Sequence, residues 1–557
     1  MQYRSGDTTQ GLERQTHRAL YKSMGYDDKD LKKPIIGIAN AWSTMVPGHY
    51  NLRTVSEFVR KGIKSAEGMP VEFGVIGACT GIADGHQGAH YVLPTRELIA
   101  NSIEVMAEAH RLDGLVLLGS CDKIIPGMLM AAVRLDIPAI LVNGGPALGG
   151  TEFNGKKSDV TTLKEALGHY RGGDISETDL LAMEDQVMPT CGSCSRLGPA
   201  NTMACIAEAL GMALPGTGVI PAEHWARKKA AFQSGTQIVE LVNKGLSARK
   251  IMGPAALQNA IRLSSAIGGS TNVALQIPAI AYEAAIDFSV GLLDELSAQT
   301  PLLIDLSPDS FANVPDFYEA GGVPAVLKEI EALLEKDALT VTGETVGENL
   351  QHVVKDQHGD LIRALDNPHP KTGGLAILYG NLSPEGAVAK PGAIDPAMWR
   401  FEGPAKVFDS ENEAVEAIGA DKIRAGDVLV LRYMGPKGGP GMPEMSQVGR
   451  LLKEKKLAGK TAIISDGRFS GTTNGCFVGH ISPEAAEGGA LAIVAEGDVI
   501  VIDIRKRKID LNLSQSDIKT RQAKWRRPPI KVKSGYLRMY AQTARSAAHG
   551  AIIPNRD

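Results

Sequence analysis

The stretch Leu-Val-Leu-Leu-Gly-Ser-Cys-Asp-Lys, residues 115–123, decides the fold. Its first five residues form an apolar run typical of a buried strand, and Cys121, Asp122 and Lys123 follow almost at once. Similar runs, which end near Gly, Cys or Asn, alternate with stretches of helical spacing, and this alternation predicts a parallel α/β sheet. Such sheets collect reactive groups in the loops after their strands. The predicted strands are residues 34–39, 71–77, 115–119 and 139–142, and the predicted helices are residues 52–66 and 95–110.

The rest of the chain divides into a helical stretch and a region of short strands. Residues 195–334 have a mostly helical pattern, and a segment rich in Pro and Gly begins at Asn367. We therefore expect an N-terminal α/β domain over residues 1–366 and a β-rich, barrel-like C-terminal domain over residues 367–557. The strand-like segments of the second domain are residues 375–378, 428–431, 461–464, 491–494 and 499–504.

The composition is that of an ordinary globular protein. The chain has 557 residues, 43% of them hydrophobic and 22% charged, with a formal net charge of −4. This length favours two domains, and the charge pattern indicates neither a nucleic-acid partner nor a membrane surface. No apolar signal core and no apolar run of about 18 residues is present, so we expect a cytoplasmic protein whose six cysteines are reduced thiols or ligands.

The first candidate site is Cys121-Asp122-Lys123 at the end of a predicted buried strand. A thiolate, a carboxylate and an ammonium are unfavourable together at such a place unless something binds there. The plain alternative is a surface loop with a half-buried cysteine. In the functional interpretation, the thiol suits iron or zinc and the carboxylate suits magnesium.

The second candidate site is the Cys-x-x-Cys pair of Cys191 and Cys194. Alone it could be a redox pair, half of a zinc site, or a cluster ligand with a spare thiol. No second Cys-x-x-Cys is present, which argues against a structural zinc site. Together with Cys79 and Cys121 it supplies thiols from three separate loops, which suits an iron–sulfur cluster. Three cysteines would leave one iron open to bind a substrate oxygen.

Two polar loops lie in the C-terminal domain. Residues 465–473, Ser-Asp-Gly-Arg-Phe-Ser-Gly-Thr-Thr, follow an apolar strand and could be a phosphate-binding loop or an ordinary turn. The glycine-rich residues 435–445 lack the spacing of a nucleotide-binding loop, and their useful group is the carboxylate of Glu444.

These loops and several further motifs resemble the dihydroxy-acid dehydratase and 6-phosphogluconate dehydratase family, and the resemblance runs through nearly the whole chain. The shared motifs are Cys121-Asp-Lys with Pro126-Gly, Asp466-Gly-Arg-Phe-Ser-Gly, Pro34-Ile-Ile-Gly, Val46-Pro-Gly-His, Cys191-Gly-Ser-Cys, Gly268-Gly-Ser-Thr-Asn, Tyr379-Gly-Asn-Leu-Ser-Pro-Glu-Gly, Gly438-Gly-Pro-Gly-Met and Gly479-His-Ile-Ser-Pro-Glu-Ala.

The resemblance implies a hydro-lyase with an iron–sulfur cluster and Mg²⁺, usually a homodimer. Cys121 and Cys194 would be cluster ligands in the N-terminal domain. Mg²⁺ would be held by Asp122, Glu444 and a carbamylated Lys123. Ser470, on the C-terminal loop, would be the general base that removes the C2 proton of a 2,3-dihydroxy acid.

The chain departs from the family at the expected cofactor sites. Relatives often carry a cluster cysteine at the position of Gly48, and Cys79 would supply that third ligand here unless it is a buried structural cysteine. Thr80 stands where relatives usually have an Asp or Glu ligand for magnesium, and a neutral hydroxyl weakens a site for a hard cation. Asp84 could replace the missing carboxylate. Cys191 is expected to be an accessory thiol.

The resemblance leaves the substrate open. We expect 2,3-dihydroxyisovalerate and 2,3-dihydroxy-3-methylvalerate, the dihydroxy acids of valine, leucine and isoleucine biosynthesis. An aldonate is the alternative, because Arg196 and Gln276 differ from residues common in the branched-chain enzymes. An alternative of another class is a non-catalytic redox sensor that holds the cluster as a switch. Both [4Fe–4S] and [2Fe–2S] clusters are compatible with the thiols, and the Gly48 and Cys79 arrangement favours the four-iron form.

Overall fold

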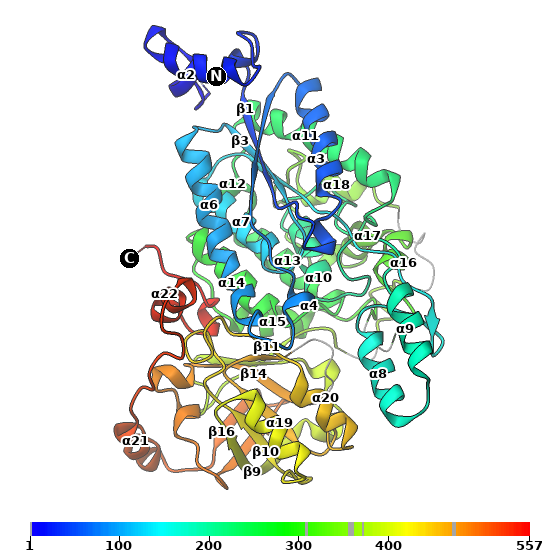
Figure 1. Ribbon diagram of the computed structural model, residues 1–557, viewed down its shortest axis with the longest axis vertical. Coiled ribbons are helices and arrows are strands. Elements are labelled where there is room, and N and C mark those ends of the chain that lie inside the picture. The colour runs from blue at the N-terminus through cyan, green and yellow to red at the C-terminus, as the bar shows by residue number, and fades with distance from the viewer. Residues whose placement is uncertain (1–2, 307–309, 355–360, 370–371, 470–474, 557) are drawn as a thin grey trace.

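The computed structural model describes residues 3–306, 310–354, 361–369, 372–469 and 475–556 of the chain. Its N-terminal body contains a four-stranded sheet in the order β2-β1-β3-β4, and all its strand pairs are parallel (Figure 1). This confirms the predicted α/β class, although β2 ends at Gly74 and leaves residues 75–77 in a loop. The strands are β1 (Ile35–Asn40), β2 (Met69–Gly74), β3 (Gly114–Leu118) and β4 (Ala139–Val142).

Helices cover both faces of this sheet. The chain runs from β1 to β2 through α3 (Leu52–Ser65), then to β3 through α6 (Thr95–Ala109) and to β4 through α7 (Ile124–Leu135). The connection from β1 to β2 runs opposite to the next two, so right-handed crossovers place α3 on one face and α6 and α7 on the other (Figure 1). α3 and α6 confirm the two predicted helices.

A helical layer follows the sheet in sequence and packs beside it. α7 packs against α14, and α3 packs against α11. The layer confirms the helical pattern predicted for residues 195–334. No helix among the described residues is both long and apolar enough to cross a membrane. The main helices of this layer are α10 (Pro199–Ala209), α11 (Trp225–Lys244), α13 (Pro254–Ala266), α14 (Val273–Glu283), α15 (Gly291–Gln299), α16 (Val314–Glu319) and α17 (Gly322–Glu329).

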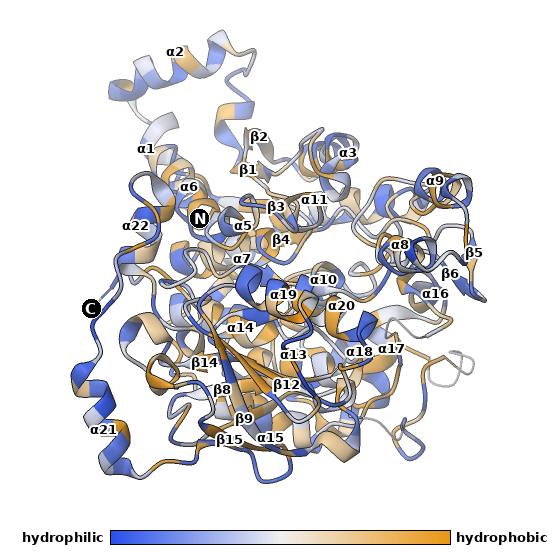
Figure 2. Ribbon diagram, turned by 60° about the horizontal axis from the view of Figure 1, so that its bottom comes forward, coloured by the Kyte–Doolittle hydropathy of each residue, from blue (hydrophilic) through white to orange (hydrophobic). Residues whose placement is uncertain are grey.

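The C-terminal body contains an eight-stranded mixed sheet in the order β16-β15-β9-β10-β12-β14-β8-β7. Its apolar strands pass through the middle of that body (Figure 2). Tyr379, directly after β7, bridges to Lys508 at the start of β16, so the two edges of the sheet meet and the sheet is barrel-like, as predicted. The strands are β7 (Ala376–Leu378), β8 (Gly386–Ala389), β9 (Arg400–Phe408), β10 (Val428–Leu431), β12 (Ala462–Ser465), β14 (Cys476–Ser482), β15 (Val499–Asp503) and β16 (Lys508–Leu511).

One strand prediction in this body is wrong. Residues 491–494 read as a strand, but the structure has a 3₁₀ helix over Ala490–Ile493 whose residues are all buried. A short apolar run reports burial and does not distinguish a strand from one turn of helix. Helices also flank the barrel-like sheet, namely α19 (Glu411–Gly419), α20 (Gln447–Glu454) and α21 (Gln515–Lys524).

The end of the chain returns to the N-terminal body (Figure 1). After α22 (Tyr536–Thr543) the tail lies against α14, where a Cβ on Gly550 would come within 2.7 Å of Ala279 N. The fully buried Arg96 donates to Gly550 O at 2.6 Å and to Gln276 Oε1 at 2.9 Å. The last residues therefore complete the N-terminal body.

A buried carboxylate makes the stability of the N-terminal body depend on pH. Glu208 on α10 accepts hydrogen bonds from Gly216 N and Gly218 N, both at 2.7 Å, and burial outweighs these bonds and raises its pKa from 4.5 to about 7. The folded state thus binds a proton that the unfolded state has released, and stability falls as pH rises from 4.5 to 7. This group should contribute a loss of at most about 3 kcal/mol.

The substitution Glu208→Gln should remove most of that pH dependence. The measurement is the free energy of unfolding in denaturant at pH 5 and pH 7.5, compared between the wild-type protein and the variant. Glu240→Gln is the matched control, because Glu240 lies exposed on α11 beside Lys244. An unchanged pH slope in Glu208→Gln would contradict the assignment.

Candidate active site

The loop after β3 places three reactive side chains at the carboxyl edge of the sheet. Cys121 has a φ of +74°, in the left-handed region that residues other than glycine rarely adopt. Asp122 and Lys123 follow it and are buried. A strained backbone beside a buried carboxylate and ammonium marks a candidate functional site.

Three thiols lie close enough to influence one another. Burial raises the pKa of Cys121 well above its ordinary value, and the charges of Cys79 and Cys194 raise it further. Burial also raises the pKa of Cys194, with a contribution from Cys79 that Arg196 opposes. The thiols come from three loops, as predicted: Cys79 precedes α4 (Thr80–Ala83), Cys121 follows β3, and Cys194 precedes α10.

The remaining cysteines have other surroundings. The Cys191 thiol donates to Glu223 Oε1 at 2.9 Å, and burial together with this carboxylate raises its pKa to about 12. Its role as an accessory thiol stays a prediction. Cys205 and Cys476 are fully buried in the two hydrophobic cores.

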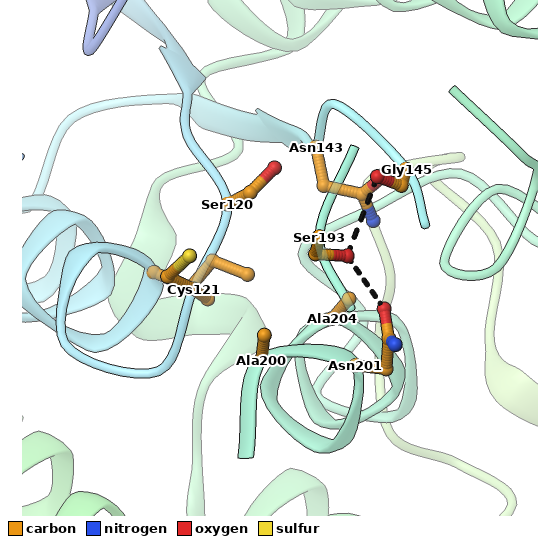
Figure 3. A pocket seen from close by; sticks show the side chains of 9 residues that line it. Ser120, Cys121, Asn143, Gly145, Ser193, Ala200, Asn201 and Ala204 are labelled. Atoms are coloured by element: carbon orange, nitrogen blue, oxygen red, sulfur yellow. Dashed lines mark hydrogen bonds between the residues drawn. The ribbon is translucent and has the colours of Figure 1, made fainter. Parts of the chain in front are cut away.

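A small pocket lies behind Cys121 and joins two of the thiol loops (Figure 3). Ser193 Oγ donates to Asn201 Oδ1 at 2.9 Å, and Asn201 Nδ2 donates to Cys194 O at 2.6 Å. These bonds fix the position of the Cys194 loop relative to α10. The pocket is lined by Ser120, Cys121, Ile125, Asn143, Gly145, Ser193, Ala200, Asn201 and Ala204.

A buried charge centre lies beside the thiols and joins the two bodies. Lys123 Nζ is 2.6 Å from Asp122 Oδ2 and 3.0 Å from Glu444 Oε1. Asn272 Nδ2 donates to the same two oxygen atoms, at 2.7 and 2.9 Å. Arg468 lies 2.8 Å from Glu444, since Glu444 of β11 (Glu444–Met445) pairs in register with Arg468 of β13 (Arg468–Phe469). We call these five side chains the charge centre.

The two cations keep Glu444 ionised. Burial alone would raise the pKa of Glu444, but the charges of Lys123 and Arg468 and the hydrogen bond from Asn272 lower it to about 2. Arg468 is itself held by Met442 O, which accepts from its Nε at 2.9 Å and from its Nη2 at 2.7 Å. The centre thus holds two carboxylates and two cations, with no net charge.

The motifs that contain Asn272 and Arg468 do not by themselves predict a role for these two side chains. A sequence motif identifies a loop but not the direction of its side chains, so only the contacts in the structure show that Asn272 and Arg468 belong to the charge centre. Asp466 of the same loop has a structural role, because its carboxylate accepts from Met434 N at 2.8 Å and from Ala485 N at 2.9 Å. His480 lies near Arg468 and Glu444, and burial together with Arg468 lowers its pKa to about 3, so it is neutral.

The two residues predicted at the altered magnesium position differ in their contacts. Thr80 Oγ1 lies 3.4 Å from Lys123 Nζ and 3.5 Å from Asp122 Oδ1, at the edge of the charge centre. The Asp84 carboxylate lies 2.5 Å from Lys164 Nζ and accepts from Ser446 Oγ at 3.2 Å. The contacts of Asp84 are therefore with groups outside the charge centre.

Comparisons with known proteins show the family of the chain. The family models of the N-terminal and C-terminal domains of dihydroxy-acid/6-phosphogluconate dehydratases match residues 33–349 and 360–551. The chain belongs to this family. It is 50% identical over 552 residues to a dihydroxy-acid dehydratase of Caldanaerobacter subterraneus, with 99% of both chains covered. It is 47% identical over 555 residues to a dihydroxy-acid dehydratase of Acetivibrio thermocellus, with 99% of this chain and 100% of the relative covered.

The thiols of this dehydratase-family chain fit an iron–sulfur cluster. The three thiols are half-buried, and the pKa values of Cys121 and Cys194 are raised, so free thiolates are unfavourable there and the charge of a bound iron cluster would stabilise them. Among the described residues, no three His, Cys, Asp or Glu side chains surround one point as the ligands of a single metal ion do. The cysteines of a cluster do not all bind one iron atom, so they need not meet at one point.

The magnesium site of the family fits less well. The place between Asp122 and Glu444 is taken by the Lys123 ammonium, and Thr80 offers a hydroxyl where the resemblance implies a third carboxylate. The side chains as they stand therefore do not form a magnesium site. Ser470, the predicted general base, lies outside the described residues, directly after β13.

Proposed function

We propose that the chain is a dihydroxy-acid dehydratase that converts 2,3-dihydroxyisovalerate and 2,3-dihydroxy-3-methylvalerate into 2-keto acids in branched-chain amino-acid biosynthesis. The observation that supports this most is the meeting of three thiols with a buried charge centre at the carboxyl edge of the sheet. Full-length relatives named dihydroxy-acid dehydratase support the same substrates.

The elimination requires a base for C2 and an electrophile for the C3 hydroxyl. A cluster bound by Cys79, Cys121 and Cys194 would supply Lewis-acid chemistry at that hydroxyl. Ser470 accepts the C2 proton, the C3 hydroxyl leaves, and the enol becomes the 2-keto acid without a change in oxidation state. Lys123 and Arg468 keep Glu444 ionised, and the Lys123–Glu444 ion pair joins the two bodies beside the thiols.

The test is 2-keto acid formation by anaerobically purified, cluster-reconstituted protein, with 2,3-dihydroxyisovalerate compared against a panel of aldonates. Preference for dihydroxyisovalerate supports the proposal. A protein that contains the cluster and turns over none of these acids would support the redox sensor instead. The role of Ser470 is tested by exchange of the C2 proton with solvent deuterium, which Ser470→Ala should lose.

An aldonate dehydratase is the second candidate, and Arg196 favours it. The Arg196 charge acts on both Cys194 and Lys390, so its guanidinium lies near the thiols. Its Nε is buried and has no hydrogen-bond partner within the described part of the chain. Such a donor suits the additional hydroxyl groups of a sugar acid. Activity on aldonates alone would establish this candidate.

We also propose that the protein is a cytoplasmic homodimer. Helix α2 (Gln15–Ser23) projects from the N-terminal body and has no buried residue (Figures 1 and 2). Large apolar side chains on and beside this helix, those of Leu12, Leu20 and Met24, are exposed, which suits contact with a second copy. Light scattering after size exclusion should give twice the chain mass of 59.0 kDa, and the mass of one chain would contradict a dimer.

A further inference from the structure

The charge centre is already neutral without a metal ion. Asp122 and Glu444 contribute two negative charges, and Lys123 and Arg468 contribute two positive charges. The side chains are almost closed to solvent, with exposed fractions of 3% for Asp122, 12% for Glu444, 0% for Lys123 and 2% for Arg468. In such surroundings any added charge that is not balanced is strongly unfavourable.

Thr80 completes the surroundings of the Lys123 ammonium. An ammonium has three N–H donors, and Lys123 Nζ has three acceptors within reach. These are Asp122 Oδ2 at 2.6 Å, Glu444 Oε1 at 3.0 Å and Thr80 Oγ1 at 3.4 Å. A hydroxyl at this position satisfies the third donor and adds no negative charge.

We infer that the Lys123 ammonium is the resident cation of this centre and that Thr80 makes it a weak site for Mg²⁺. Magnesium requires a near-octahedral set of oxygen atoms at about 2.0–2.1 Å and gives up its water reluctantly. Here the inner oxygen atoms of both carboxylates already accept from Lys123 and Asn272. A divalent ion between them would also lie beside a buried ammonium.

A carboxylate at position 80 would reverse this balance. The centre would then hold three carboxylates against two cations, and a net negative charge favours a bound metal ion. Thr80→Asp should therefore create a magnesium site from residues already in place. Thr80→Ser is the matched control, because it keeps the hydroxyl and adds no charge. Asp84→Asn is a second control, because the Asp84 carboxylate contacts Lys164 and Ser446 instead.

The experiment is titration calorimetry with MgCl₂ on the full-length, cluster-loaded protein under anaerobic conditions. Wild type, Thr80→Ser and Asp84→Asn should bind Mg²⁺ weakly and alike, and Thr80→Asp should bind at least about tenfold more tightly. Micromolar binding to the wild-type protein would overturn the inference even if Thr80→Asp failed to fold. Equal affinity of wild type and a folded Thr80→Asp would overturn it as well.

The state of Lys123 gives a second readout. Carbon-13 NMR of wild-type protein equilibrated with ¹³C-bicarbonate and Mg²⁺ should show no carbamate signal, and a signal that disappears in Lys123→Arg would overturn the inference. The inference rests on the proposed function for the identity of the site but not for its test. Weak Mg²⁺ binding without turnover of dihydroxy acids would contradict the proposed function and leave the inference about Lys123 and Thr80 standing.

Discussion

Replacement of Cys121 by Ser should lower dehydratase turnover by at least about a thousandfold, because it removes one of three thiols that we assign to the cluster. The charges of both Cys79 and Cys194 raise the pKa of Cys121, so its thiol is near both of the others. A serine hydroxyl is a poor ligand for iron, so bound iron and acid-labile sulfide should fall together with turnover. Both are measured on protein purified and reconstituted without oxygen.

Three other cysteines provide matched controls for Cys121→Ser. Cys205→Ser and Cys476→Ser change thiols in the two cores and should retain iron, with at most a loss of stability. Cys191→Ser should retain the cluster as well, because its thiol bonds to Glu223. Iron content that falls in Cys191→Ser but not in Cys121→Ser would exchange the roles of these two residues.

The substitution Glu444→Gln should lower both the stability of the protein and its activity. It removes the negative charge that Lys123 and Arg468 share, at 3.0 and 2.8 Å, and leaves a buried centre with a net positive charge. Breaking a buried ion pair from one side typically costs about 3–5 kcal/mol. Chemical denaturation should show a decrease of this size in the free energy of unfolding, and turnover should fall because Glu444 pairs with Lys123 across the two bodies, next to the thiol of Cys121.

The control for Glu444→Gln is Glu496→Gln. Glu496 pairs with Lys406 at 2.8 Å, but its side chain is 60% exposed. An exposed pair of this kind contributes about 1 kcal/mol or less, so the control should be nearly as stable as wild type. Equal effects of the two substitutions would show that the charge centre stabilises the protein no more than an exposed ion pair does.

The sequence predicted the sheet and the loops of the site because these depend on local pattern. The apolar runs before Cys121 and at residues 139–142 alternate with helical stretches along the chain, which predicts buried strands. The structure has the buried strands β3 and β4 at these positions. Contacts between distant residues could not be predicted in the same way. Asn272 reaches Asp122 across 150 positions of sequence, and Arg468 reaches Glu444 through the register of two short strands.

The direction of a side chain also escaped prediction. Thr80 and Asp84 lie four residues apart, yet only Thr80 contacts the charge centre while Asp84 contacts Lys164. Thr80 begins the single helical turn α4, but Asp84 follows that turn in extended backbone, so the i, i+4 spacing of a helix does not relate the two side chains. The apolar run at residues 491–494 likewise indicated burial, but it could not distinguish a strand from the 3₁₀ helix that the structure has there.

The return of the tail to α14 has a consequence for how the protein is made. The acceptors at Gly550 and Ala551 for the buried Arg96 guanidinium lie 454 and 455 residues after it, so they leave the ribosome long after Arg96 does. Until then the N-terminal body, though synthesised first, has a buried cation without two of its acceptors. Translation must therefore pass residue 551 before this body is complete, and we expect nascent chains stalled before residue 550 to be more sensitive to protease than chains in which residues 550 and 551 have emerged.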